Sequence, residues 1–412
     1  MPNPGQNYIA RMKTTLKKKT NITSRKTIRI STQQNLKYPR YTASIAQTSN
    51  LKKKTNTKVK KMVVAQIMTD SESASKEGLF FEREHYKQVV GGQNCDIWGT
   101  KADGSQVLLA KLRVGVLGQK ECVAAFKALE PFAKKTWNVN RGAAAGQVSL
   151  RKLPKYVGEV VQKKEGGFRL YYRGKDGKLR QDNISNRVRS NIIGFYDQPD
   201  RNKLAGGQKA PKMPCRMTAW TRDHPREWHH AIIPLVQQID RQFAQLLPDR
   251  HRVQFQRASQ TPDFQIPQTA FSTMTVNYNY QSANHKDAGD LDEGFGNLIV
   301  LERDKCVGGA EATRYEGGLL GFPQYGVALD VRQGDFCAVN VHEWHCNTKI
   351  SPSIGNTRIG PGISPSTTNL LSGVGKAQIG SKNKTIKPQD ETWGRMTLVC
   401  YLRKGMLDKC II

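Results

Sequence analysis

Alternating apolar and polar residues predict a set of short β-strands, concentrated in the second half of the chain. The predicted strands in that half are 271–280, 297–301, 336–340 and 395–403. Further strands are predicted upstream at 96–100, at 106–112, within 157–172 and at 190–196. Asp-Gly pairs beginning at Asp103 and Asp176 lie beside these upstream strands, and such pairs are a strong signal for a hairpin turn.

Two longer stretches carry apolar residues at spacings of three or four, which is the pattern of an amphipathic helix. They are 119–135, with Pro131 near its end, and 228–247. The apolar positions are Cys122, Phe126, Leu129 and Phe132 in the first, and Ile232, Leu235, Ile239, Phe243 and Leu246 in the second. Because the second helix has one clear apolar face, we expect it to pack on a sheet.

Three stretches are too polar to contribute to a core. Residues 1–62 are rich in Lys, Thr, Asn and Ser, and we expect them to form a disordered basic tail. The folded part is expected to begin near Gly78. Residues 206–214 are expected to form a loop, and the Gly/Ser/Asn-rich segment 351–390 a mobile surface insertion. For the tail, an alternative is that the protein starts at Met62.

The chain is strongly basic, with a formal net charge of +31. About half of the excess lies in residues 1–61, which contain 16 Lys or Arg and no acidic residue; the sequence LKKKTN occurs there at 16–21 and again at 51–56. Such a charge favours polyanionic partners, and the repeated patches suit DNA phosphates or nuclear import. We therefore expect a nuclear protein. The alternatives are an organellar transit peptide, which 12 Lys against 4 Arg disfavour, and a tail that only aids solubility.

The sequence argues against several classes of protein. It has no run of 18 apolar residues, so no membrane span is expected, and its N-terminus lacks the apolar core of a secretory signal. The eight cysteines include no CxxC pair, which argues against a zinc finger. Cysteines scattered over a long chain indicate free thiols in a reducing compartment.

Candidate chemistry begins at His285 and Asp287, after the predicted strand 271–280. Residues two apart in an extended segment point to the same side, so the imidazole and the carboxylate project together. This is two-thirds of the 2-His-1-carboxylate site that holds non-heme Fe(II) and leaves positions open for substrate and O₂. His342 and His345, 57 and 60 residues after the first histidine, are both candidates for the third ligand, and spacing alone does not choose between them.

A candidate anchor for a keto acid lies at the start of the last predicted strand. Arg395 and Thr397 are two residues apart, so a guanidinium and a hydroxyl share one face and can hold the distal carboxylate of 2-oxoglutarate. Arg358 is a rival anchor, although it lies in the insertion. Asparagines alternate with tyrosines on the strand before the first candidate ligand, and of these Asn277 is a candidate contact of the co-substrate.

These motifs, in this order, resemble those of the TET/JBP family of dioxygenases, which oxidise the 5-methyl group of pyrimidine bases in DNA. The resemblance covers about residues 120–405 and looks closest to the TET-like proteins of fungi, algae and protists; the cysteine-rich region of the animal enzymes is absent. It rests on HKDAGD at 285–290, VHEWHCN at 341–347, RMTLVCYLR at 395–403, NRGAAAG at 140–146 and SNIIGFYD at 190–197.

The resemblance implies an α+β fold with a double-stranded β-helix (jelly-roll) core flanked by helices, in a domain spanning residues 78–405. It implies iron ligands at His285, Asp287 and His345, and 2-oxoglutarate bound by Arg395. The second of the two later histidines is preferred because the Cys-Asn that follows it fits the family pattern.

The resemblance also suggests Asp290 and Asn140 as readers of the base. A carboxylate accepts a hydrogen bond from N4 of cytosine and mismatches O4 of thymine; the alternative for Asp290 is a structural role in a turn. The implied reaction uses Fe(II), 2-oxoglutarate and O₂ to convert 5-methylcytosine in DNA to 5-hydroxymethylcytosine, or further, after the base is flipped out of the duplex. The oligomeric state is not determined by the sequence, and we expect a monomer.

Three other functions remain open. The first is a related enzyme that uses ascorbate as co-substrate and attaches a glyceryl unit to the methyl group of 5-methylcytosine. The second is a hydroxylase of thymine in DNA or of a methylated base in RNA. The third is a DNA-binding module with a degenerate, metal-free jelly roll, which the intact motifs argue against.

Overall fold

The computed structural model describes residues 58–139, 141–148, 158–162, 168–197, 215–307, 314–353 and 392–410. Contacts divide the chain into two units, Met1–Asn56 and Thr57–Ile412, and every described residue belongs to the second. The predictions that lie outside the described residues concern the tail up to residue 57, Asn140, the loop 206–214, Arg358 and most of the insertion 351–390. None of the described helices combines the length and the apolar character that crossing a membrane requires.

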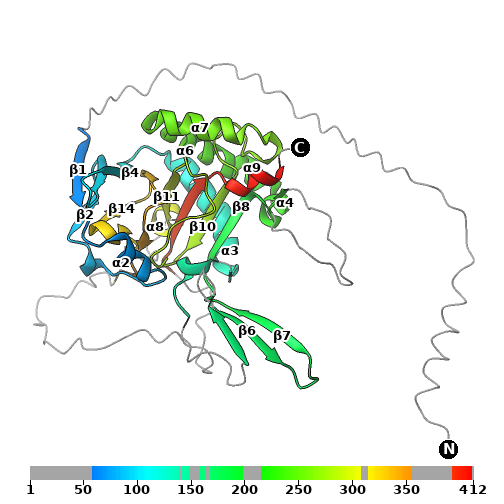
Figure 1. The fold of residues 1–412 in the computed structure, drawn as a ribbon. Helices are drawn as coiled ribbons and strands as arrows, with labels where there is room; N and C mark the ends of the chain where they lie inside the picture. The colour runs from blue at the N-terminus through cyan, green and yellow to red at the C-terminus, as the bar shows by residue number, and fades with distance from the viewer. Residues whose placement is uncertain are drawn as a thin grey trace, which may run out of the picture. The chain divides into compact units, whose positions relative to one another are not determined.

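A sheet of nine strands lies at the centre of the described fold (Figure 1). Its order is β1-β3-β4-β15-β11-β18-β10-β8-β9, and every neighbouring pair is antiparallel except β1 and β3. The strands are β1 (Lys60–Ala65), β3 (Cys95–Thr100), β4 (Gln106–Arg113), β8 (Ser190–Tyr196), β9 (Arg216–Met217), β10 (Thr273–Tyr278), β11 (Gly296–Glu302), β15 (Phe336–Val339) and β18 (Arg395–Tyr401). Every residue of β11 is buried, so both faces of the sheet are covered at its centre.

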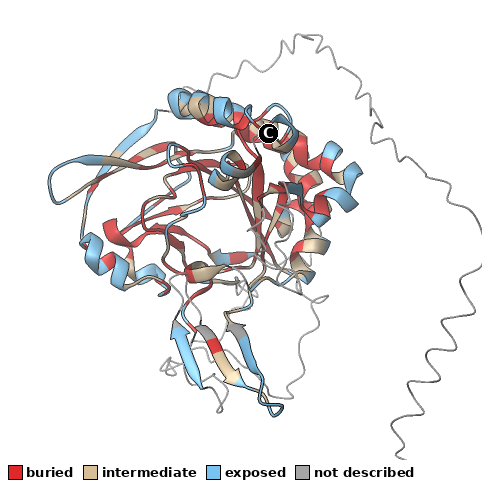
Figure 2. Cartoon of the chain, turned by 45° about the vertical axis from the view of Figure 1, so that its right-hand side comes forward, coloured by how far each residue is buried: buried red, intermediate tan, exposed pale blue. Residues whose placement is uncertain are grey.

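Helices cover one face of this sheet, and their buried side chains form a single core with it (Figure 2). Phe126 and Leu129 of α3 (Gln119–Lys135) and Ile239 and Phe243 of α6 (Ile233–Leu246) pack with strand residues such as Ile299. Both predicted helices are confirmed, although the first turn of the second, Trp228–Ile232, is π-helical. The other helices are α2 (Asp70–Ser75), α4 (Ala219–Asp223), α5 (Pro225–Glu227), α7 (Pro248–Ala258), α8 (Arg303–Val307) and α9 (Lys404–Cys410).

A four-stranded sheet covers the opposite face, in the order β16-β13-β14-β2. A second core lies between the two sheets and contains Ile97 and Val300 from the large sheet and Phe322 and Leu329 from the small one. The small sheet consists of β2 (Gln88–Gly91), β13 (Leu320–Phe322), β14 (Val327–Asp330) and β16 (Cys346–Asn347), and β12 (Tyr315–Gly317) pairs separately with β17 (Ile350–Pro352). The predicted class is thus confirmed as a mixed protein of helices around a large, mainly antiparallel sheet.

A third sheet of three antiparallel strands forms an arm: β5 (Glu159–Gln162), β6 (Phe168–Arg173) and β7 (Leu179–Ile184). The turn between β6 and β7 contains the predicted Asp-Gly pair, and Gly177 has the left-handed φ of 73° that such a turn requires. The β structure predicted within 157–172, before this turn, is therefore confirmed, and β7 follows the turn.

Two predicted boundaries are wrong. Residues 60–62, assigned to the tail, lie in β1, which pairs in parallel with β3 along its whole length. The run Met62-Val63-Val64-Ala65 supplies the apolar residues of this edge strand, although lysines precede it, and α2 also lies before Gly78. At the insertion, Ser351 and Pro352 lie in β17, so the strand continues past the predicted start of the loop.

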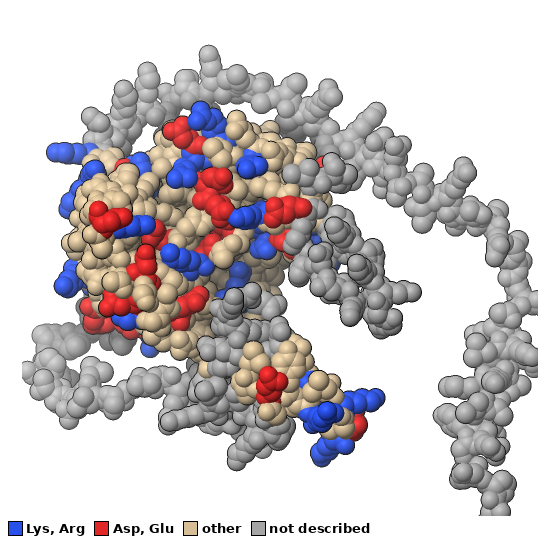
Figure 3. All heavy atoms as spheres, viewed as in Figure 1, with Lys and Arg blue, Asp and Glu red and all other residues tan. Residues whose placement is uncertain are grey.

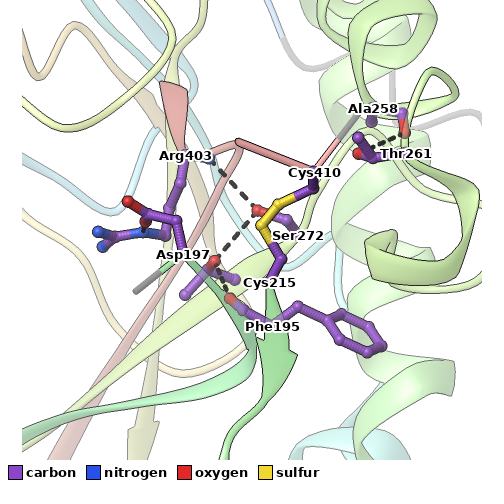
Figure 4. Close-up of a disulfide and its surroundings, with 9 residues drawn as sticks. Phe195, Asp197, Cys215, Ala258, Thr261, Ser272, Arg403 and Cys410 are labelled. Carbon is purple, nitrogen blue, oxygen red and sulfur yellow. Dashed lines mark hydrogen bonds and ion pairs between the residues drawn. A yellow bond between two sulfur atoms is a disulfide. The ribbon is translucent and has the colours of Figure 1, made fainter. Parts of the chain in front are cut away.

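The prediction of free thiols is wrong for one pair of cysteines. Cys215 and Cys410 form a disulfide, with Cα atoms 5.6 Å apart (Figure 4). The two residues are separated by 195 positions, and the bond ties the end of α9 to the segment that enters β9. The other six cysteines are buried and free. Burial raises the pKa of these thiols, as at Cys122, where it reaches about 11.

Candidate metal and substrate site

The candidate metal ligands follow β10, where the chain leaves the large sheet. Asn279, directly after the strand, has a left-handed φ of 45°, a conformation that asparagine tolerates better than most residues. Its N–H donates to the carbonyl of Arg395 (2.9 Å), and its side-chain oxygen accepts from the Arg395 N–H (2.8 Å). Asn279 therefore ends the strand and turns the chain toward the ligands.

Backbone hydrogen bonds fix the positions of the three candidate ligands. His285 and His345 form an isolated antiparallel bridge, in which the N–H of each donates to the carbonyl of the other at 3.0 Å. The N–H of Asp287 donates to the carbonyl of Val341, also at 3.0 Å. The loop after β10 is thus attached to the segment that enters β16, which brings together residues 60 positions apart.

The side chains of the three residues converge on one point. Nε2 of His285 lies 3.4 Å from Oδ1 of Asp287, and Nε2 of His345 lies 3.9 Å from Oδ2 of the same carboxylate. One ligand atom from each residue lies within 4.8 Å of the others. A metal about 2.1 Å from three atoms at right angles separates them by about 3 Å, so small side-chain movements close this site around an ion.

Both imidazoles are oriented for metal binding by their second nitrogen. Nδ1 of His285 lies 2.8 Å from the carbonyl of Ala283, and Nδ1 of His345 lies 3.0 Å from the carbonyl of Glu343. A carbonyl only accepts, so each Nδ1 carries a proton, and in the neutral ring each Nε2 keeps the lone pair that a metal binds. Such outer contacts fix the tautomer and the ring plane of histidine ligands. The residues present therefore fit a divalent ion such as Fe(II).

The charges of the three groups are interdependent. Burial alone lowers the pKa of His285, but the hydrogen bond and charge of Asp287 outweigh it, so that the pKa lies above the usual 6.5. Burial raises the pKa of Asp287, yet the hydrogen bond and charge of His285 hold it well below its usual range. Burial and the charge of His285 lower the pKa of His345 to about 4. At neutral pH, His345 and Asp287 are thus in the protonation states that a metal requires.

The structure places the other candidate histidine apart from this cluster. Nε2 of His342 lies 3.1 Å from the carbonyl of Leu291, and its backbone N–H interacts with Asn340 (3.3 Å). His342 is not among the residues that lie together around the candidate metal position. Of the two alternatives that spacing left open, the geometry favours His345.

The three ligands line a cavity of about 460 Å³, which is large enough for a small ligand beside a metal. The cavity lies between the two sheets and includes Leu298 of the large sheet and Leu320 of the small one. The other predicted site residues that line it are Asn277, Asp290, Arg395 and Thr397. Thus every sequence-predicted site residue that the structure describes, apart from His342, contributes to one cavity.

Arg395 and Thr397 lie on the same face of β18, as their spacing predicts. Both are buried, and an Arg395 Nη1–H donates to the hydroxyl of Thr397. Nε of Arg395 has no hydrogen-bond partner within the described ranges, nor has the side-chain oxygen of Asn277. Among those residues, no ion pair includes Arg395. A buried guanidinium without a carboxylate is costly, so this one fits an anionic ligand such as a keto acid.

A glycine makes room for this guanidinium. Gly318 has a left-handed φ of 69°, and a Cβ atom there would lie 2.9 Å from both Cδ and Nε of Arg395. Gly318 also lines the cavity. Any larger residue at this position would strain the backbone and displace the arginine side chain.

Asp290 lies in the same cavity, three residues after Asp287, the candidate carboxylate ligand. Asp290 is 9 % exposed, and its backbone pairs with that of Arg403 in an isolated antiparallel β-bridge. The side chain of Arg403 donates through Nε to Asp197 at 2.6 Å (Figure 4). Burial and the charge of Asp287 raise the pKa of Asp290 well above its usual value, while Arg403 and Arg141 oppose this rise. The neutral form of the Asp290 carboxyl group is therefore favoured more than in an aspartate on the surface.

Sequence reasoning missed one polar residue of the cavity, Arg141. Its Nε donates to the carbonyl of Ser190 (3.0 Å), whereas one of its terminal nitrogens is buried without a partner in the described structure. Its charge lowers the pKa of both Asp287 and Asp290. Arg141 lies within NRGAAAG, so this segment was the available signal; Asn140, which we singled out there, lies outside the described residues.

Comparison with known proteins gives a family match over about half of the chain. Residues 203–404 match the Tet_JBP family, described as the oxygenase domain of the 2OGFeDO superfamily. This segment contains the three clustered ligands, Asp290 and the Arg395–Thr397 pair; Arg141 lies before it.

Similar proteins include thymine dioxygenases of trypanosomes. Thymine dioxygenase JBP1 of Trypanosoma brucei brucei is 30% identical over 169 residues, which are 40% of this chain and 17% of the relative. Thymine dioxygenase JBP1-B of Trypanosoma cruzi is 26% identical over 233 residues, 55% of this chain and 22% of the relative. The chain thus spans about a fifth of the length of these relatives. The solved structure of NgTET1 in complex with 5mC DNA has 11% identity and a TM-score of 0.38, covering 78% of this chain and 84% of the other.

Proposed function

Because residues 203–404 carry an oxygenase domain of the TET/JBP family, which uses Fe(II) and 2-oxoglutarate, we propose that this protein oxidises the 5-methyl group of a pyrimidine in DNA. The observation that carries this proposal is a single cavity that contains His285, Asp287 and His345 together with the guanidinium of Arg395, which has no carboxylate partner among the described residues. The two facing sheets around this cavity support a double-stranded β-helix core, which is part of the same proposal.

The side chains of the cavity have separate tasks in the proposed reaction. His285, Asp287 and His345 hold the metal, while Arg395 and Thr397 hold the distal carboxylate of 2-oxoglutarate. Bound iron, 2-oxoglutarate and O₂ supply the oxidation of a methyl C–H bond to an alcohol, with succinate and CO₂ as the other products. The protein binds and orients the reactants and keeps the cavity apart from bulk water.

The base must leave the duplex to reach this cavity. A methyl group stacked inside DNA cannot approach a metal between two sheets, and flipping a nucleotide costs a few kcal/mol. Contacts of Lys and Arg with phosphates offset this cost, and the chain has a net charge of +31. DNA as the substrate also agrees with the nuclear location that we propose.

We propose 5-methylcytosine as the base, with Asp290 as its reader. Whether charged or neutral, the carboxyl group of Asp290 accepts a hydrogen bond from N4 of cytosine, whereas only the neutral form donates to O4 of thymine. The side-chain amide introduced by Asp290→Asn would both donate and accept. We expect this variant to raise turnover of thymine relative to 5-methylcytosine by about tenfold, within the roughly 1–3 kcal/mol of a good base contact. Product mass spectrometry with duplexes that contain one base or the other measures this ratio, and an unchanged ratio would exclude Asp290 as the reader.

Thymine is the second candidate base, because the similar trypanosomal proteins are named thymine dioxygenases. One experiment decides between the bases and tests the proposal as a whole. The protein is incubated with Fe(II), O₂ and duplexes that carry either 5-methylcytosine or thymine. The co-substrate is 2-oxoglutarate in one set of reactions and ascorbate in the other. We expect 5-hydroxymethylcytosine only when 2-oxoglutarate is present. If a protein loaded with iron leaves both bases unchanged, the proposed function is wrong.

The raised pKa of His285 predicts that metal affinity depends on pH. A metal binds the neutral imidazole, so its binding displaces the proton that His285 holds below its pKa. The pKa values of Asp287 and His345 are lowered, so these groups are already deprotonated in that range. We expect Mn(II) affinity, measured by titration calorimetry, to fall by about tenfold for each pH unit below the pKa of His285, since one proton is released. Constant affinity from about pH 8 to about pH 6 would contradict the raised pKa.

A further inference from the structure

The β5–β7 arm presents an unusual surface to solvent. Leu179 is 67% exposed, and Val160 and Val161 are 41% and 40% exposed. The turn between β6 and β7 and the strand ends beside it carry four cations and one carboxylate: Arg173, Lys175, Lys178 and Arg180 with Asp176. Figure 3 shows Lys and Arg gathered at the end of this arm. The single acidic group of this described turn is paired with a cation, because Arg180 donates to Asp176 at 3.2 Å.

The base of the arm is attached directly to the rim of the cavity. The side-chain amide of Asn186, just after β7, donates to the carbonyls of Ala145 (3.0 Å) and Gly146 (3.1 Å). Val188 and Asn138 exchange two backbone hydrogen bonds, at 2.8 and 2.9 Å. The 3-10 turn Gly142–Ala145 lies between these contacts, and its first three residues line the cavity. The base of the arm is therefore hydrogen-bonded to the segment that forms one edge of the cavity.

An aromatic ring with two guanidinium groups lies at this junction. Trp137 is 47% exposed, although tryptophan is usually among the better buried residues. The guanidinium carbons of Arg189 and Arg187 lie 4.9 and 6.0 Å from the centre of its ring. Ser190, which directly follows Arg189 in the sequence, lines the cavity. The cluster of Trp137, Arg187 and Arg189 therefore lies at the cavity rim.

We propose that the β6–β7 hairpin and the Trp137 cluster together form the surface that binds duplex DNA around the nucleotide entering the cavity. This inference rests on the proposed function and names the DNA-binding face of that site. Two strands of six residues each extend about 20 Å, and a two-stranded ribbon fits the major groove of B-DNA. The cations of the turn contact phosphates on one side, while Trp137 and its arginines contact the bases and phosphates beside the displaced nucleotide.

The test compares two charge reversals in the full-length protein. Lys175→Glu with Lys178→Glu alters the arm, and Arg252→Glu with Arg257→Glu makes the same change in charge on exposed residues of α7, which lies away from the arm in Figures 1 and 2. Binding of a labelled duplex is followed by fluorescence anisotropy at several salt concentrations, without iron or 2-oxoglutarate. We expect the arm variant to bind the duplex at least about tenfold more weakly, and the slope of log affinity against log salt concentration to become shallower by about two. The affinity of the control variant should change by less than about threefold.

Replacement of the exposed ring gives a second test that does not depend on net charge. We expect Trp137→Ala to weaken duplex binding at least about fivefold and Trp137→Phe to restore most of it, because an aromatic face is what the base contacts. The inference is wrong if both charge reversals reduce affinity equally, or if neither the arm variant nor Trp137→Ala does so. Because this assay needs no turnover, a protein that binds DNA through the arm but oxidises no base would contradict the proposed function alone.

Discussion

Replacing His345 with alanine is expected to remove metal binding and to lower turnover by more than about 100-fold. The reason is that His345 supplies one of three ligand atoms that lie within 4.8 Å of one another, and loss of even an outer contact of a metal ligand costs about 10–100-fold. Titration calorimetry with Mn(II), and turnover of a methylated duplex with Fe(II) and 2-oxoglutarate, measure the two effects.

The matched control for this change is His342→Ala. His342 lies three residues away and uses its ring to contact the carbonyl of Leu291, so its loss should cost about 1 kcal/mol of stability and leave metal affinity unchanged. If His342→Ala were the variant that lost the metal, or if His345→Ala kept its affinity, the ligand assignment would have to be reversed.

Replacing Arg395 with methionine is expected to raise the KM for 2-oxoglutarate by about 10–100-fold. This corresponds to about 1.4–2.8 kcal/mol, the range for hydrogen bonds to a charged group. The same change should not lower the thermal stability of the protein without ligands, because Arg395 is 3% exposed and no carboxylate in the described part of the chain forms an ion pair with it. A buried charge without a compensating partner is costly to the folded state, so we expect its removal to be neutral or stabilising.

A structural role for Arg395 would give the opposite pattern. In that case Arg395→Met would lower the midpoint of thermal unfolding and would reduce kcat and the affinity for every ligand together. Thr397→Val is the graded companion, since it keeps the shape of the side chain and removes one hydrogen bond; it should raise the KM for 2-oxoglutarate by about tenfold or less.

The sequence was informative where the fold depends on local pattern. The helix Gln119–Lys135 has the predicted ends, because its apolar residues recur at helical spacing over its full length. Five strands of the large sheet were predicted with small errors at their ends, since they lie in the apolar core and carry continuous or alternating apolar residues. They are β8, β10, β11, β15 and β18. Each of these elements can be recognised without knowledge of its partner.

Elements whose stability depends on a distant partner were missed. The first three residues of β1 were assigned to the tail because lysines precede its short apolar run, yet pairing with β3 makes them part of a strand. The disulfide between Cys215 and Cys410 joins positions 195 apart, and no local pattern indicates such a pair. In both cases the deciding contact exists only after the sheet has formed.

In the candidate site, too, local spacing was informative and long-range contacts were not predicted. The spacing of His285 and Asp287, and that of Arg395 and Thr397, predicted side chains on a common face, and the structure places all four in one cavity. Spacing did not separate His345 from its neighbour, because the bridge to His285 that orients it is a long-range contact. Arg141 was missed for a related reason. The segment NRGAAAG was recognised, but only the fold shows that its arginine lies near the two carboxylates Asp287 and Asp290.

The most direct measurement of the central claim is the position of a bound metal. Crystals grown with Mn(II) and 2-oxoglutarate, without O₂, would be measured for anomalous scattering from manganese. We expect one strong peak within ligand distance of Nε2 of His285, Nε2 of His345 and the carboxylate of Asp287, with the distal carboxylate of the keto acid on Arg395. A peak elsewhere, or an empty cavity in crystals that contain both ligands at saturating concentration, would contradict it.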